Sequence, residues 1–170
     1  MPGVKADITV SIAASLIGAA DLGTPRQTLD TISQIVQFAP GTASVGQADI
    51  LFADTRTLAA SATENLDLAG VLTNAFGTVI AAAEVVAIYV KAADANTNSV
   101  VIGAAASTPF AGPLGATGTY AVLPGEYFLA VSQKGWAVAA GTADLLKIAN
   151  SSSGTPVTYD IVIIGRTVAA

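Results

Sequence analysis

Short runs of β-branched and aromatic residues, each closed by a turn signal, recur along the chain and constrain its fold more than any other feature. The clearest runs occupy residues 84–91 and 99–103, and the Asp- and Asn-rich segment 94–98 between them predicts a hairpin turn. Pro124-Gly125 has the residues of a type II turn between two further runs. These patterns predict antiparallel strands, and no long helical repeat competes with them.

Further segments have the composition and alternation of strands. They cover residues 7–12, 49–58, 63–69, 120–123, 126–131, 136–138, 145–149 and 158–164. In residues 29–38 the apolar spacing is near-helical but the residue types favour a strand, so we predict a strand, with one short helix as the alternative. About ten short strands predict an all-β fold, an antiparallel β-sandwich with the jelly roll as a candidate topology and a less regular N-terminal region.

A change of pattern at residues 60–63 suggests where the chain divides. We predict an N-terminal β arm or subdomain over residues 1–62 and a β-sandwich over residues 63–170. One continuous domain is the alternative, since a chain of 170 residues can bury a single core without metals or disulfides.

The composition disfavours most enzyme chemistry. The chain has no Cys and no His, and its 12 acidic and 7 basic residues are spread thinly. The segment 94–105 begins like an EF-hand loop, but Ser99 and Ala105 replace its essential Gly and Glu. Asp30 and Asp54 precede threonine as in aspartic proteases, but the glycine that should follow is missing at both places. We therefore expect no enzyme, no catalytic or metal-ligating residues, no cofactor and no small-molecule substrate.

Charge and hydropathy limit the partners. A net charge of −5 without a basic cluster argues against nucleic acid. Hydrophobic residues make up 52% of the chain, yet its best uncharged run, residues 68–83, is shorter than the roughly 20 residues that span a bilayer. We expect no membrane partner. The first residues lack the pattern of a signal peptide, which predicts synthesis in a cytoplasm.

Two features are candidates for protein contact. The Ala-, Gly- and Pro-rich stretch 104–118 is predicted to be a long exposed loop that grips a neighbour. Trp136 is either an exposed anchor for such a contact or a core residue, and core packing is favoured. The candidate contact residues are Pro109, Phe110, Pro113, Leu114 and Trp136.

Several phrases of the sequence are similar to a known family. TENLDLAG, AIYVKAADANTNSVVIG, LPGEYFLAV, GWAV and GTADLLKIANSSSGTPVTYDIVIIG, with QADILFADTRTLAAS upstream, resemble small virion structural proteins of tailed bacteriophages. The resemblance covers about two thirds of the chain. These phrases describe strands and turns, so the resemblance transfers no catalytic residue.

The resemblance implies a capsid decoration, or cement, protein. Its expected place is the outer surface of the phage head, after synthesis in the host cytoplasm. Its expected partners are the major capsid protein and copies of itself, with a homotrimer as the expected oligomer and with the N-terminal region or the loop 104–118 reaching adjacent subunits. The alternatives are a tail, baseplate or fibre subunit, and a carbohydrate-binding β-sandwich for host attachment.

Overall fold

The computed structural model describes residues 3–170, which form eleven strands and no helix. The strands are β1 (Ala6–Ile17), β2 (Arg26–Pro40), β3 (Gln47–Ala48), β4 (Ile50–Leu58), β5 (Thr63–Asp67), β6 (Glu84–Ala92), β7 (Val100–Gly103), β8 (Thr119–Val122), β9 (Tyr127–Ala137), β10 (Leu145–Asn150) and β11 (Val157–Arg166). The strand predicted over residues 29–38 is confirmed within β2, and the alternative helix is wrong.

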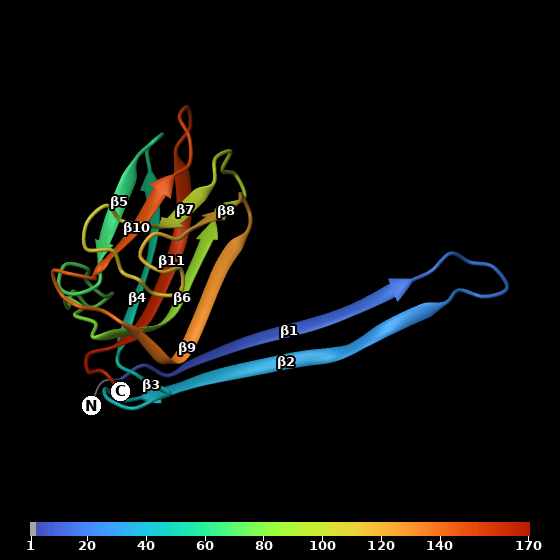
Figure 1. The fold of residues 1–170 in the computed structure, drawn as a ribbon, viewed down its shortest axis with the longest axis horizontal. Coiled ribbons are helices and arrows are strands. Elements are labelled where there is room, and N and C mark those ends of the chain that lie inside the picture. Colours follow the sequence, from blue (N-terminus) through green and yellow to red (C-terminus); the bar gives the residue numbers. More distant parts are fainter. Residues whose placement is uncertain (1–2) are drawn as a thin grey trace. The chain divides into compact units, whose positions relative to one another are not determined.

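Eight of these strands build a sandwich of two four-stranded antiparallel sheets (Figure 1). One sheet has the order β4-β11-β6-β9 and the other the order β5-β10-β7-β8. From β4 to β11 the chain changes sheet at every step except between β7 and β8, and this connectivity is that of a jelly roll. The predicted fold class is therefore confirmed, including the candidate topology.

The core lies between the two sheets because strand alternation points one set of apolar side chains inward. Val100 and Ile102 of β7, Ile148 of β10, and Ile161 and Ile163 of β11 are at most 1% exposed. Each such side chain contributes about 1.5–3 kcal/mol when it leaves water. All members of the main core cluster lie between residues 50 and 163.

A second buried group lies outside that core. Val86 of β6 and Ile164 of β11 are buried, as are Phe38 at the end of β2 and Ala48 in β3. None of the four belongs to the main cluster. Since β3 contacts β11, we place this group on the outer surface of the β4-β11-β6-β9 sheet, under the segment 38–48. The result is that β6 is buried almost throughout.

The chain divides into two compact units, residues 6–37 and residues 3–5 with 38–170. This division differs from the predicted boundary between residues 62 and 63. The reason is that β4, upstream of that boundary, pairs with β11 along its whole length and so belongs to the sandwich. Residues 1 and 2 of the predicted N-terminal region lie outside the described residues.

Candidate assembly surface

Residues 6–37 form a unit of their own, which we call the arm. It consists of β1 and most of β2, joined by the turn 18–25 into an antiparallel hairpin (Figure 1). The turn is closed by a hydrogen bond of 2.8 Å from the Gly18 N–H to the Pro25 carbonyl. Only Asp7, Asp21, Arg26 and Asp30 carry charge in this unit.

The two faces of β1 differ in polarity. Alternation along β1 places Ile8, Val10, Ile12 and Leu16 on one face, opposite Thr9, Ser11 and Ser15. The Gln37 amide donates to the Asp7 carboxylate at 2.7 Å, so these two side chains share the polar face. Val36, next to Gln37, consequently falls on the same side as Ile8. By the same alternation, Ile35 and Leu29 fall on the side of Gln37, so large apolar side chains stand on both faces of the arm.

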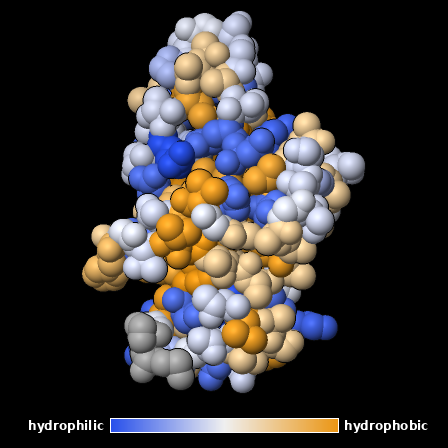
Figure 2. Space-filling model, turned by 90° about the vertical axis from the view of Figure 1, so that its left-hand side faces the viewer, coloured by the Kyte–Doolittle hydropathy of each residue, from blue (hydrophilic) through white to orange (hydrophobic). Residues whose placement is uncertain are grey.

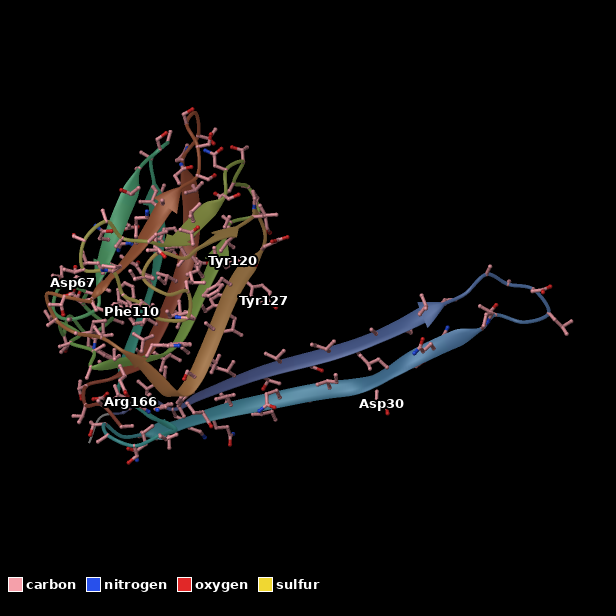
Figure 3. The ribbon with its side chains drawn as sticks, in the orientation of Figure 1. Asp30, Asp67, Phe110, Tyr120, Tyr127 and Arg166 are labelled. Carbon is pink, nitrogen blue, oxygen red and sulfur yellow. The ribbon has the colours of Figure 1, made fainter. Side chains whose placement is uncertain are left out.

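The arm has more large apolar side chains than a hairpin can bury. A two-stranded ribbon has no interior, and such a ribbon alone is at best marginally stable in water. Figure 3 shows its side chains, Asp30 among them, standing off the ribbon with no second layer from the same unit. The large apolar residues that are more than 40% exposed are Val10, Ile12, Leu16, Ile17, Leu22, Leu29, Ile32 and Ile35. These residues make the arm the best candidate for a contact surface.

The segment that follows the arm is fixed to the sandwich by Arg166. Its guanidinium is fully buried and forms an ion pair with Glu84, including a hydrogen bond of 3.0 Å from Nε. Nη1 donates to the carbonyls of Ser44 at 2.9 Å and Gln133 at 3.1 Å, and Nη2 donates to the Lys134 carbonyl. One side chain therefore ties residues 44, 84 and 133–134 to the last strand.

Gly135 makes room for this ion pair. Its φ of 90° lies in the region that favours glycine, and a Cβ there would lie 3.0 Å from Nη2 of Arg166. A larger residue would therefore meet both backbone strain and the buried guanidinium. We interpret the Arg166 cluster as structural, because each of its polar groups is already satisfied within the described chain.

A second polar cluster closes one side of the sandwich. Arg56 on β4 donates to Glu64 on β5 at 2.9 and 2.5 Å and also pairs with Asp54. The buried Tyr159 donates its hydroxyl to Glu64 at 2.5 Å. Burial, with this hydrogen bond, raises the pKa of Tyr159 above its usual value, and the bond to Glu64 raises the pKa of Arg56. These side chains bind one another and so join β4, β5 and β11.

The segments that resemble an EF-hand loop and aspartic protease loops show no such site in the structure. Asn96 and the Thr158 backbone exchange hydrogen bonds of 2.8 and 2.9 Å, and Asn98 bonds Asn150 and backbone carbonyls of the 152–155 loop. Asp30 and Asp54 belong to different units. Among the described residues no group of three or more acidic, His or Cys side chains is placed to hold a metal ion.

The loop 104–118 is partly built into the sandwich. Phe110 is 5% exposed and belongs to the main core, and its N–H donates to the Leu145 carbonyl at 2.9 Å. Leu114 and Trp136 are half-buried against the same core. Pro109 is also half-buried, and Pro113 is exposed. The structure leaves Pro113 the most accessible of the five candidate contact residues.

Sequence reasoning expected the N-terminal region as one of two segments that reach adjacent subunits, but it named none of the arm's apolar residues as contacts. The alternation of apolar and polar residues along β1, with few charges, is typical of a strand in an exposed hairpin. It is equally typical of a half-buried strand of the sandwich, so the sequence did not distinguish the two. Elsewhere, Figure 2 shows apolar residues mixed with polar ones over the face that it presents. No known protein family, curated protein or solved structure matches the chain. Residues 3–170 contain no helix that is long and apolar enough to cross a membrane.

Proposed function

We propose that the chain is a virion structural protein, a decoration (cement) subunit that binds the outside of a tailed-phage head. The observation that carries this proposal is the arm, a 32-residue hairpin (residues 6–37) with eight large, exposed apolar side chains and no core of its own. Such a segment gains stability only when another surface covers it. The resemblance of the sandwich segments to phage structural proteins supports the choice of a capsid.

The mechanism is mechanical. The jelly roll supplies a rigid body, and the arm supplies apolar contact area for neighbouring capsid subunits. A protein that binds the assembled shell and not its dissociated parts stabilises the shell in proportion to the logarithm of its free concentration. Many weak contacts of this kind raise the resistance of the head to internal pressure, and no bond is made or broken.

The polar clusters of the sandwich support a role without catalysis. Arg166 with Glu84, and Arg56 with Glu64 and Tyr159, satisfy one another, and of these groups Arg56 also lines an open hollow beside Thr73 and Asn74. The largest fully buried side chain is Arg166, and it bonds Glu84 and the carbonyls of Ser44, Gln133 and Lys134. These contacts favour a structural protein over an enzyme.

The test is binding to purified heads of the encoding phage that lack this protein. We expect the chain to co-sediment with heads and to raise the temperature at which they release DNA. Ile35→Asp should weaken co-sedimentation at least tenfold, whereas Ala95→Asp, in the exposed turn after β6, should not. The head assignment would be wrong if the unmodified chain did not bind heads. Immunogold label on the tails of intact virions would then favour the tail alternative.

The carbohydrate-binding alternative rests on exposed tyrosines. Tyr120 and Tyr127 are 43% and 61% exposed, and they stack on Phe128 and Tyr89 with ring centroids 5.1 and 5.8 Å apart. Tyr127 and Phe128 are consecutive on β9, so the two pairs point to opposite faces of the strand. They do not build one platform. A glycan array that gave specific binding would nevertheless favour this alternative.

A further inference from the structure

The uncharged run 68–83 contains a small hairpin that connects β5 with β6. Thr73 and Val79 form an antiparallel bridge, and the Ile80 N–H donates to the Leu72 carbonyl at 2.8 Å. Leu72 and Ile80 are at most 9% exposed and belong to the main core. The base of this hairpin is therefore fixed to the sandwich.

The tip of the hairpin, residues 74–78, is closed by Asn74, and we call it the Phe76 turn. The Asn74 N–H donates to the Thr78 carbonyl at 2.8 Å, and its side-chain oxygen accepts bonds of 3.0 Å from the N–H groups of Phe76 and Thr78. Gly77 has a φ of 77°, in the region that favours glycine, and its N–H donates to the Asn74 carbonyl at 2.9 Å. The backbone that carries Phe76 is thus held in one conformation before a partner binds.

The side chain of Phe76 is 93% exposed and is not alone. Val71 and Val79 on the same hairpin are exposed, as is Leu51 of β4, which lines the same hollow as Phe76. These four are among only nine large apolar residues of the segment 38–170 that are more than 40% exposed. Single exposed apolar residues are ordinary on a protein surface, but a cluster of them marks a contact surface.

A hollow of about 370 Å³ lies beside Phe76. It is lined by Leu51 and Ala53 of β4 and by Lys5, among others. Ala6, the first residue of the arm, directly follows Lys5 in the chain. A partner that binds the first residue of the arm therefore lies beside this hollow.

The charge of this region argues against a membrane or a nucleic acid as the partner. No residue of the run 68–83 is charged, and of the described residues that line the hollow only Lys5 is basic, with Asp49 offsetting it. An anionic lipid surface or a phosphate backbone is bound by several basic groups. One aromatic ring also buries less apolar area than a single acyl chain, which by itself binds a bilayer only marginally. An uncharged, apolar protein surface fits the cluster best.

The area of the cluster shows that this contact supplements the arm. A buried Phe side chain covers about 150–250 Å². Even with Val71, Val79 and Leu51 the cluster stays below the roughly 800 Å² that each partner supplies to a standard interface. The Phe76 turn alone is too small to hold a complex together. Two linked contacts on one partner reinforce each other, because the first keeps the second at a high effective concentration.

We infer that Phe76 is a second anchor of this protein, which inserts into an uncharged apolar pocket on the same protein surface that the arm binds. The hollow beside Phe76 receives an apolar side chain of that partner. The inference rests on the proposed function, which makes that surface the outside of the phage head. Aromatic side chains are enriched in interface cores, and a fixed turn loses little conformational freedom on binding, so this ring carries most of the affinity that the sandwich adds.

The test is co-sedimentation of the full-length chain, over a series of concentrations, with purified heads that lack it. Phe76→Ser should weaken binding about 10- to 100-fold, the factor that burial of one such side chain contributes. Leu123→Ser makes the same kind of change at a side chain that is 50% exposed between β8 and β9, and it should leave the affinity unchanged. Because both side chains are exposed, near-ultraviolet circular dichroism and the urea midpoint should match those of the unmodified chain.

Equal binding of the unmodified chain and the Phe76→Ser variant to heads would overturn this inference and leave the proposed function standing. An unmodified chain that does not bind heads would overturn both. Equal losses in Phe76→Ser and Leu123→Ser would also overturn the inference, because exposed apolar area in general would then be responsible. Vesicles of phosphatidylcholine and phosphatidylglycerol test the membrane as partner. We expect no binding to them, and binding that depends on Phe76 would refute the assignment of a protein pocket.

Discussion

Arg166 shows what a single buried charge does in a sandwich of low charge content. The guanidinium and the Glu84 carboxylate are both buried, and each neutralises the other. Removing one partner leaves the other charge in an apolar environment, which typically costs about 3–5 kcal/mol. We therefore expect Arg166→Met to lower the free energy of unfolding by about that amount, measured by urea denaturation.

The double variant separates charge from packing. Glu84→Met combined with Arg166→Met removes both charges, so its destabilisation should be smaller than the sum of the two single effects. The carbonyls of Ser44 and Gln133 would still lose their donor, so some cost remains. Additive single effects would contradict the assignment of a coupled ion pair.

Tyr159 gives the sandwich a dependence on alkaline pH. Burial and the hydrogen bond to Glu64 raise the pKa of this phenol above the ordinary value of 10.0. The folded chain thus holds the proton more tightly than the unfolded chain does. The corresponding stability is fully present below about pH 10 and is lost progressively as the pH rises above it.

The measurement is a spectrophotometric titration of the four tyrosines. Tyr159 should ionise only as the chain unfolds, so a late alkaline step in the tyrosine absorbance should coincide with the loss of the folded signal. Tyr159→Phe should abolish that late step and cost about 1 kcal/mol, because Glu64 keeps its bond to Arg56. A Tyr159→Phe variant whose absorbance titration kept the late step would refute the placement of this hydroxyl.

Among the elements, the loop 104–118 behaves as part of the core although its composition is that of a loop. Phe110 fills a position between the sheets (Figure 3). Truncation to alanine should therefore cost about 3–5 kcal/mol of unfolding free energy. Pro113→Ala, three residues away at an exposed position, should change it by less than about 0.5 kcal/mol. Equal effects of the two substitutions in thermal or urea unfolding would show that the loop is not anchored.

The strands with strong local signals could be predicted from the sequence. The runs in β6 and β11 are β-branched and aromatic, and the Pro124-Gly125 turn marks the start of β9. A local sequence pattern cannot decide between two structures that are both compatible with it. The spacing of Leu29, Ile32 and Ile35 suits a helix as well as a strand, and only pairing with β1 decides the matter.

The candidate site was less accessible to sequence reasoning than the fold. The Arg166–Glu84 pair joins positions 82 residues apart, and Tyr159 meets Glu64 across 95 residues. No local pattern encodes such distances. The arm was expected as an N-terminal region, but its exposure depends on β4 pairing with β11, which leaves β1 and most of β2 outside the sandwich.

At the scale of the whole molecule, the core and the proposed assembly surface lie in different units. Every residue of the main core cluster lies between residues 50 and 163, so the arm contributes none of the burial that stabilises the sandwich. The arm in turn carries eight large apolar side chains that are more than 40% exposed. A substitution in the arm should consequently leave the stability of the sandwich unchanged. A substitution in the core of the sandwich should leave the apolar surface of the arm unchanged.

Excision of residues 6–37 tests this separation. A Cβ on Gly3 would lie 2.5 Å from the Cβ of Pro40, and the Val4 N–H donates to the Ala48 carbonyl at 3.0 Å, so the two chain ends lie close together. A two-residue glycine linker between Lys5 and Phe38 can therefore replace the arm. Phe38 and Ala48 stay in place and keep the outer surface of the sheet covered.

The shortened chain should unfold cooperatively, with a free energy within about 1 kcal/mol of the full-length value, because no core contact is lost. It should also lose binding to phage heads. Thermal unfolding followed by near-ultraviolet circular dichroism measures the first property, and co-sedimentation measures the second. A shortened chain without a cooperative transition would mean that the sandwich depends on the arm. If the shortened chain were stable and still bound heads at full affinity, the binding surface would lie on the jelly roll and not on the arm.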